Sequence, residues 1–305
     1  MLMKSITNQQ LLEELANRLQ SSPGLEEEHQ LLKKELVQLN KKLEESEALK
    51  SHFISNITNE IINPFASILG LSKAILSVDK ENWKKVLSMT SLIYTEAFAL
   101  DFQLKNIFSA AKIESGEIYP EIGTVDVMNM TQSIIDTFKI ESKKKNLKIE
   151  TTIDESVSKS QQNGSFFFKT DPEKFKLILL NLLNNAVKYS FEDGIITIRI
   201  WKVESMLYIS VKDRGTGISD EHQHVIFDRF KRVDSGITST NRGHGLGLSI
   251  NKALLDLLGG DIKISSSLGE GSTFTVNFPE ASEDSMLMAS DDNELFFDSD
   301  DQEVF

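Results

Sequence analysis

The 305-residue chain contains no cysteine, which excludes disulfide bonds and metal sites built from thiolates. Its five histidines include no pair with the H-x-x-x-H spacing of a zinc-binding helix, so a zinc site is not expected. No run of about 18 apolar residues occurs, so we expect no membrane span, and the start, MLMKSITNQQ, lacks the apolar segment of a signal peptide. These absences together favour a cytoplasmic protein.

Positive charge is also scarce, and the net charge of −13 is unevenly distributed. Residues 281–305 contain nine acidic residues and no basic residue, so the rest of the chain carries −13 minus −9, or −4. Because no basic stripe is present, nucleic-acid binding is disfavoured. The acidic segment is predicted to be disordered. It either folds on a partner, occupies a basic groove, or only solubilises the chain.

Two glycine-rich clusters lie in the C-terminal half. Asp213–Gly217 follows a strand-like run, and Gly243–Gly247 leads into a helical run. Glycine lets the backbone approach a ligand closely, and the start of a helix offers free N–H groups to an anion. We therefore expect the second cluster to bind phosphate and Asp213 to accept a hydrogen bond from a ligand amine. Taken alone, either cluster is more typical of an ordinary turn.

A polar stripe runs along a predicted helix that begins after Asp171, a good N-cap followed by a first-turn proline. Asn181, Asn185 and Lys188 or Tyr189 have the spacing of residues on one helix face. Asparagines are costly on an apolar helix unless they meet a ligand, a hydrated metal or a partner. The face suits a Mg²⁺-polyphosphate, with Asn185 as the residue that would hold the metal through the nucleotide. The alternative is a solvated polar stripe.

Together these segments resemble the ATP-binding domain of sensor histidine kinases, within the wider GHKL family of gyrase-type and Hsp90-type ATPases. The matching motifs are the N box Asn181–Tyr189, the first G box Asp213–Gly217, the F box Phe227–Phe230, the second G box Gly243–Leu248 and the late strand Gly271–Phe274. The resemblance implies ATP and Mg²⁺ as cofactors. The nucleotide-binding residues that it implies are Asn181, Asn185, Lys188, Tyr189, Asp213, Gly215, Gly217, Phe227, Phe230, Arg232, Gly243, Gly245, Leu246, Gly247, Leu248 and Thr273.

The N-terminal part is predicted to be helical. In residues 1–46 a heptad of leucines predicts a short parallel coiled coil, with one amphipathic helix as the alternative; its seam residues are Leu25, Leu32, Leu36, Leu39 and Leu43. Residues 47–115 are predicted to form two helices, the first of which contains Pro64 and should bend there. Such a hairpin has too small a core to be stable alone. We expect two copies to pair as a four-helix bundle, which makes the protein a homodimer.

This hairpin resembles the dimerisation and phosphotransfer domain of the same kinases, whose first helix carries the motif H-E-x-x-[TN]-P. The matching residues run from Asn59 to Pro64, so Asn59 replaces the phosphoacceptor histidine and Ile62 replaces a common basic residue. An amide nitrogen is a very poor nucleophile because its lone pair is delocalised. We therefore expect no autophosphorylation at position 59. An active histidine kinase is the alternative if Asn59 stands where the natural chain has histidine.

Two residues of this motif are retained. Glu60 and Asn63 keep an E-x-x-N spacing on one helix face. In related proteins such a pair orients water to hydrolyse the aspartyl phosphate of a response regulator, so the resemblance implies the same role for Glu60 and Asn63. That role is mainly a positioning task. The alternative is that Asn63 only caps the bend before Pro64 and the motif has no remaining activity.

The predicted fold is α+β, with the N-terminal helical parts followed by a two-layer α/β sandwich over residues 120–280 and the acidic tail 281–305. Within the sandwich we expect strands near 123–127, 148–153, 195–203, 206–212, 261–266 and 272–278, and helices near 128–143, 172–190, 220–226 and 246–258. We expect a two-component signalling protein that binds ATP without autophosphorylating and regulates a response regulator or another histidine kinase. The alternatives are a non-enzymatic scaffold and a kinase that acts on a protein hydroxyl. The polar loop 228–243 is expected to form a lid over the nucleotide.

Overall fold

The computed structural model describes residues 30–34, 36–38, 40–41, 61–79, 82–154, 157, 164–228 and 245–282. The chain divides into two compact units, Met1–Ser55 and Asn56–Phe305. In the first unit the described residues are helical, and Leu32 and Leu36 are exposed in the single chain. The other seam residues lie outside the described residues, so the coiled coil stays a prediction.

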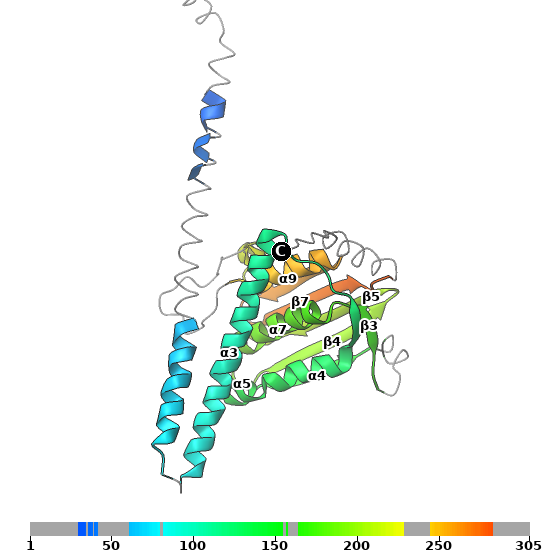
Figure 1. The fold of residues 1–305 in the computed structure, drawn as a ribbon. Coiled ribbons are helices and arrows are strands. Elements are labelled where there is room, and N and C mark those ends of the chain that lie inside the picture. The colour runs from blue at the N-terminus through cyan, green and yellow to red at the C-terminus, as the bar shows by residue number, and fades with distance from the viewer. Residues whose placement is uncertain are drawn as a thin grey trace, which may run out of the picture. The chain divides into compact units, whose positions relative to one another are not determined.

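The helical hairpin opens the second unit. One helix covers residues 61–76, and α3 (Trp83–Ser115) follows, which confirms the second predicted helix (Figure 1). Gly116 ends α3 in the left-handed conformation, and the Glu117 N–H donates to the Lys112 carbonyl at 3.0 Å. The bend predicted at Pro64 involves residues before 61, outside the described residues.

Large apolar side chains remain exposed on both hairpin helices in the single chain; they include Ile62, Phe65, Leu69, Trp83, Leu87 and Phe108. A monomer rarely leaves so many large apolar groups in water on one short element. A second hairpin packed against this surface would bury them, and the four-helix bundle stays our prediction for how they are covered. A membrane-crossing helix is absent from the described part of the chain, where none is both long and apolar enough.

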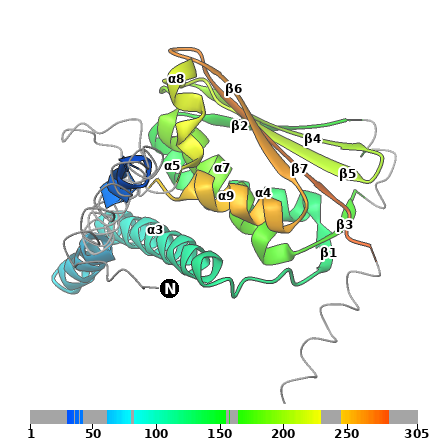
Figure 2. The same ribbon diagram turned by 90° about the horizontal axis from the view of Figure 1, so that it is seen from above.

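A mixed five-stranded sheet forms the C-terminal domain. Its order is β2-β4-β5-β7-β6, and only the β2–β4 pair is parallel. The strands are β2 (Lys148–Ile153), β4 (Ile195–Val203), β5 (Met206–Lys212), β6 (Asp261–Ser267) and β7 (Gly271–Pro279). Helices α4 (Val127–Thr137), α7 (Pro172–Tyr189) and α9 (Gly247–Leu257) cover one face of the sheet (Figure 2). The predicted two-layer sandwich is therefore confirmed.

The core lies between this sheet and the helices. Alternate residues of β5 and β7 turn inward, so that Leu207, Ile209 and Phe278 are fully buried. The Phe278 ring meets the rings of Phe168 and Phe175 edge-on, with centroids 5.7 and 5.8 Å apart. Burial of each such ring contributes about 2–3 kcal/mol. The cluster holds α7 against β7 and so determines which side of α7 points away from the core.

Three elements differ from the predicted pattern. The strand predicted at 123–127 is β1 (Gly123–Asp126), and it pairs with β3 (Phe167–Thr170) in a separate two-stranded sheet. The helix predicted over 128–143 breaks at Phe138 into α4 and α5 (Lys139–Lys144), because the turn buries the Phe138 ring edge-on against Phe98 of α3 at 5.7 Å. The helix predicted over 220–226 is split into α8 (Asp220–Gln223) and the 3-10 turn η1 (Val225–Phe227).

Candidate functional site

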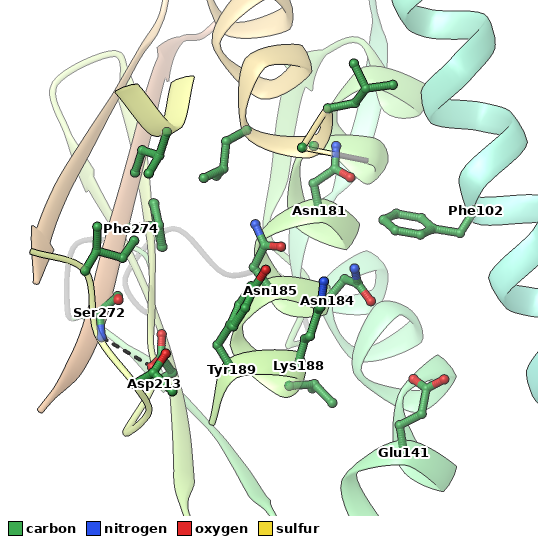
Figure 3. A pocket seen from close by; sticks show the side chains of 18 of the residues that line it. Phe102, Glu141, Asn181, Asn184, Asn185, Lys188, Tyr189, Asp213, Ser272 and Phe274 are labelled. Atoms are coloured by element: carbon green, nitrogen blue, oxygen red, sulfur yellow. Dashed lines mark hydrogen bonds between the residues drawn. The ribbon is translucent and has the colours of Figure 1, made fainter. Parts of the chain in front are cut away.

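A cavity of about 870 Å³ opens on the helical side of the sheet, bounded by α7, the start of α9, the loop after β5, the β6–β7 hairpin and α3. Figure 3 shows Asn181, Asn185 and Lys188 on the α7 side and Asp213, Ser272 and Phe274 on the strand side, with Phe102 reaching in from α3. Of the predicted site residues, those that line it are Asn181, Asn185, Lys188, Tyr189, Asp213, Gly217, Gly245, Leu246, Gly247 and Leu248. The volume lies within the range of small-molecule sites.

The start of α7 is fixed by the Asp171 cap, as the sequence predicts. One carboxylate oxygen of Asp171 accepts the Lys174 N–H at 3.0 Å, and the other accepts the Glu121 N–H at 2.7 Å. The Lys174 ammonium pairs with the same carboxylate, which is almost fully buried. These bonds join the start of α7 to Glu121, in the segment between α3 and β1, and so help to orient the helix.

The asparagines of α7 have different roles. The Asn181 side chain is buried, and its Nδ2 donates to Oδ1 of Asn251 in α9 at 2.8 Å. Asn251 in turn donates to the Ile178 carbonyl at 3.1 Å and is fully buried. The Asn181 amide nitrogen therefore joins α7 to α9, whereas Asn185 is only half-buried and lines the cavity, where it is accessible to a ligand. Helix spacing alone predicts the same ligand-binding role for Asn181 and Asn185.

Asp213 supplies a buried carboxylate where β5 ends. Its side chain is 4% exposed and accepts the Ser272 N–H at 3.3 Å. Burial raises the pKa of the Asp213 carboxyl from 3.8 to about 6, against the opposing effect of the Ser272 hydrogen bond. Apolar side chains also line the cavity, and we refer to Ile218, Ile226, Leu268 and Phe274 as its apolar wall. One acceptor in an apolar wall is the arrangement that recognises a flat heterocycle bearing an amine.

The glycines of the first cluster allow close backbone packing. A Cβ on Gly215 would lie 2.1 Å from the Tyr189 carbonyl oxygen, and one on Gly217 would lie 1.9 Å from that of Ser267. Gly217 also has a φ of 64°. The loop after β5 is therefore held against both the end of α7 and the β6–β7 hairpin. Gly215 itself does not line the cavity.

The second cluster leads into α9. Gly245 has a φ of 69°, Leu246 is the buried N-cap residue, and α9 begins at Gly247. The first N–H groups of a helix lack partners within it, and the helix dipole adds partial positive charge there. Because Gly245, Gly247 and Leu248 all line the cavity, this helix end faces it. Together with the Lys188 ammonium on α7, which also lines the cavity, this helix end has the chemistry that suits an anion.

Some predicted residues lie elsewhere. Phe227 and Thr273 do not line the cavity. On β7 it is Ser272 and Phe274 that turn inward, because side chains alternate along a strand and Thr273 points to the other face. Asn63 lies exposed in helix 61–76. Predicted residues that fall outside the described ranges are Asn59, Glu60, Phe230, Arg232 and Gly243. Of the predicted lid, residues 228–243, the structure describes only Asp228.

Several lining residues were not predicted, among them Asn184, Lys145, Glu141, Ser272 and Phe274. Strand alternation from Val276 along the same strand would have pointed to Phe274 and Ser272 in place of Thr273. Glu141 and Lys145 come from α5 and the turn after it, and no local pattern connects that segment with the glycine clusters. Burial raises the pKa of Glu141, with the Lys144 charge opposing it.

Comparison with known proteins gives the class. Residues 170–282 match the family described as histidine kinase-, DNA gyrase B-, and HSP90-like ATPases. The fold and the cavity therefore define an ATP-binding domain of the GHKL class. The full-length structure of ShkA in complex with AMPPNP shares the fold, with a TM-score of 0.51 and 21% identity, over 77% of this chain and 46% of that one.

The relatives give the family. The circadian input-output histidine kinase CikA of Synechococcus elongatus is 28% identical over 239 residues, which are 76% of this chain and 30% of that protein. The sensor protein EvgS of Escherichia coli K12 is 30% identical over 247 residues, 80% of this chain and 20% of that protein. The chain belongs to the histidine kinase family and carries its GHKL ATP-binding domain. It spans less than a third of the length of these two relatives.

The raised pKa of Asp213 predicts a stability gain on neutralisation. Because the folded-state pKa of about 6 exceeds the ordinary 3.8, the folded protein binds this proton more tightly than the unfolded chain, and stability falls as the pH rises from about 4 to 6. At pH 7.5, Asp213→Asn should raise the free energy of unfolding by about 2–3 kcal/mol, since one pKa unit corresponds to about 1.4 kcal/mol. Urea unfolding of the ligand-free protein at pH 4 to 8 measures it.

The gain should fall below about 1 kcal/mol at pH 4, where the carboxyl is protonated in the folded protein and close to half protonated in the unfolded chain. Asp101→Asn is the matched control, because Asp101 is exposed on α3 and pairs only with Lys105 there. Equal effects of the two substitutions at every pH would contradict the burial of Asp213.

Proposed function

We propose that this chain binds ATP with Mg²⁺ in the cavity and acts in two-component signalling as a nucleotide-responsive regulator that does not autophosphorylate on its hairpin. The observation that carries the proposal is that the buried Asp213 carboxylate and the start of α9 line one cavity, in a chain with Asn59 where the family motif has its phosphoacceptor histidine. Membership of the histidine kinase family supports a signalling role. The residues of the cavity and of the hairpin support the more specific role of a nucleotide-responsive regulator.

The cavity fits an adenine nucleotide. The apolar wall suits a purine ring, and the Asp213 carboxylate can accept a hydrogen bond from the exocyclic amine. The start of α9 and the Lys188 ammonium suit phosphate oxygens, and the Asn185 amide oxygen suits a hydrated Mg²⁺. Bound ATP supplies a transferable γ-phosphoryl group. The residues that line the cavity orient the nucleotide and exclude water from its purine ring.

The hairpin lacks the matching acceptor. Asn59 has no nucleophilic lone pair at nitrogen, and Ile62 replaces the basic residue of the family motif. Two departures within one motif are more typical of natural divergence than of a single substitution. The ATP site then serves conformation, exchange of hairpins with an active kinase, or dephosphorylation of a response regulator. We place this role in the cytoplasm, in a homodimer.

Calorimetry tests the nucleotide site directly. The wild-type chain should bind ATP saturably, and more tightly with Mg²⁺ than without it. Asp213→Asn should weaken binding at least about tenfold, because it replaces the charged acceptor with a weaker neutral one and adds an NH₂ donor that cannot pair with the ligand amine. Asn185→Ala should remove most of the Mg²⁺ dependence.

Thr275→Val is the control for that measurement, since Thr275 lies on β7 outside the cavity and should leave the affinity unchanged. Absence of saturable ATP binding by the wild-type chain would refute the proposed function. If Asp213→Asn abolishes binding yet leaves signalling in cells intact, the non-enzymatic scaffold is the better description.

Incubation with γ-labelled ATP tests the missing acceptor. We expect no acid-labile label on the wild-type chain, whereas Asn59→His should acquire it if the rest of the machinery is retained, because an imidazole nitrogen is a competent nucleophile. Asn59→Gln is the matched control and should stay unlabelled. Acid-labile label on any histidine of the wild-type chain would contradict the proposal, and acid-stable label on a partner serine would favour a hydroxyl kinase.

A phosphatase role is the second candidate, favoured by the Glu60 and Asn63 spacing and by the exposure of Asn63 on helix 61–76. An exposed amide there is accessible to a partner's phosphorylated aspartate. The chain should accelerate loss of phosphate from a phosphorylated response regulator, and Asn63→Ala should remove the acceleration, since the pair acts by orienting water. Asn82→Ala at the start of α3 is the control. An unchanged decay rate with the wild-type chain would exclude this branch.

A further inference from the structure

Lys145 lies outside every motif of the family resemblance, yet its ammonium occupies the end of α7. It follows α5, and its Nζ donates to the carbonyls of Val187 at 2.9 Å, Lys188 at 2.5 Å and Ser190 at 3.2 Å. The last carbonyls of a helix have no partner within it. One side chain from a distant segment thus binds two carbonyls of the last turn of α7 and the carbonyl of its C-cap residue, Ser190.

The other terminal carbonyls of α7 are bound by neighbouring groups. The Ala186 carbonyl accepts the Ser190 N–H at 3.0 Å and the Ser190 hydroxyl at 2.7 Å. The Tyr189 carbonyl accepts the Thr216 N–H at 3.2 Å. Thr216 belongs to the loop that follows Asp213. The turn of α7 that carries Lys188 and Tyr189 is therefore held on one side by Lys145 and on the other by the Asp213 loop.

The backbone around Lys145 is itself fixed. Its carbonyl accepts the Asp193 N–H at 2.9 Å, and the Asn146 side chain donates to the Asp193 carboxylate at 2.6 Å. A cation at the carbonyl end of a helix is favoured by the helix dipole. Burial lowers the pKa of the Lys145 ammonium, and the nearby Glu192 carboxylate opposes that effect. These contacts distinguish Lys145 from a solvated surface lysine.

We propose that Lys145 is a positioning residue of the nucleotide site: by binding the carbonyls at the end of α7 it sets the last turn of that helix, and thereby the places of Lys188, Tyr189 and the Asp213 loop. Its ammonium is engaged by carbonyls, so it acts through these residues and not as a direct phosphate ligand. The inference rests on the proposed ATP binding.

The test combines affinity with a local probe. The chain has four tyrosines, so incorporation of 3-fluorotyrosine gives few ¹⁹F signals, and Tyr189→Phe assigns that of Tyr189. Lys145→Met removes the charge and all three donors while keeping the stem. It should displace the Tyr189 signal, leave that of Tyr208 in place, and weaken ATP binding about tenfold, since small misplacements of binding groups are costly. Lys145→Arg keeps the charge and donors and should bind within about threefold of wild type.

Lys148→Met is the matched control, because Lys148 is three residues away and exposed, and it pairs only with Glu150. It should change neither readout. If Lys145→Met does not fold in a thermal melt, Lys145→Gln retains donor groups and should show the same signal shift with a smaller loss of affinity. The inference is overturned if the Met variant binds ATP with wild-type affinity and its Tyr189 signal is undisturbed. The same outcome decides against it in the Gln variant when that variant is used. If the wild-type chain binds no ATP, the proposed function fails, and the ¹⁹F shift alone decides whether Lys145 sets the end of α7.

Discussion

The site depends on keeping one ionised carboxylate inside the domain. Asp213 is almost completely buried, and its pKa of about 6 means that at neutral pH the folded chain carries a charge that burial disfavours. The cost of about 3 kcal/mol is a large part of the net stability of an ordinary domain. The aromatic cluster around Phe278 and the sheet beneath it offset that cost. A ligand that donates a hydrogen bond to the carboxylate would remove part of it.

The carboxylate is useful only because the surrounding backbone is held closely. Gly215 and Gly217 let the loop after β5 contact the ends of α7 and of the β6–β7 hairpin at distances that no side chain would allow. The Asn181–Asn251 bond joins α7 to α9 within the core. The apolar wall and the anion-binding helix end are thus parts of one packed unit. Preorganisation of this kind lets a site discriminate without rearranging when a ligand binds.

Much of this could be predicted from local pattern. The bounds expected for three strands are those of β2, β4 and β5, and the Asp171–Pro172 pair predicts the start of α7. Both signals act within a few residues of sequence. The cavity-lining glycines and Asp213 were predicted from the order of the sequence motifs along the chain. What could not be predicted depends on distant contacts. Phe138 breaks a helix because Phe98 of α3 offers it an edge-on partner, and Asn181 turns to Asn251 across 70 residues.

The same distant contacts bear on what a chain without the acceptor histidine can do. Phosphoryl transfer to a histidine needs an imidazole nitrogen as nucleophile, whereas position 59 carries an amide. Regulation through conformation needs physical contact between the nucleotide site and the hairpin. Lys145 binds the end of α7 and follows α5; α5 begins after Phe138, and Phe138 packs on Phe98 of α3. Each contact in that series is buried or half-buried, so a shift at one end displaces packed atoms and not solvent. The described residues therefore form a continuous packed series between the end of α7 and α3, which is the physical contact that such regulation requires.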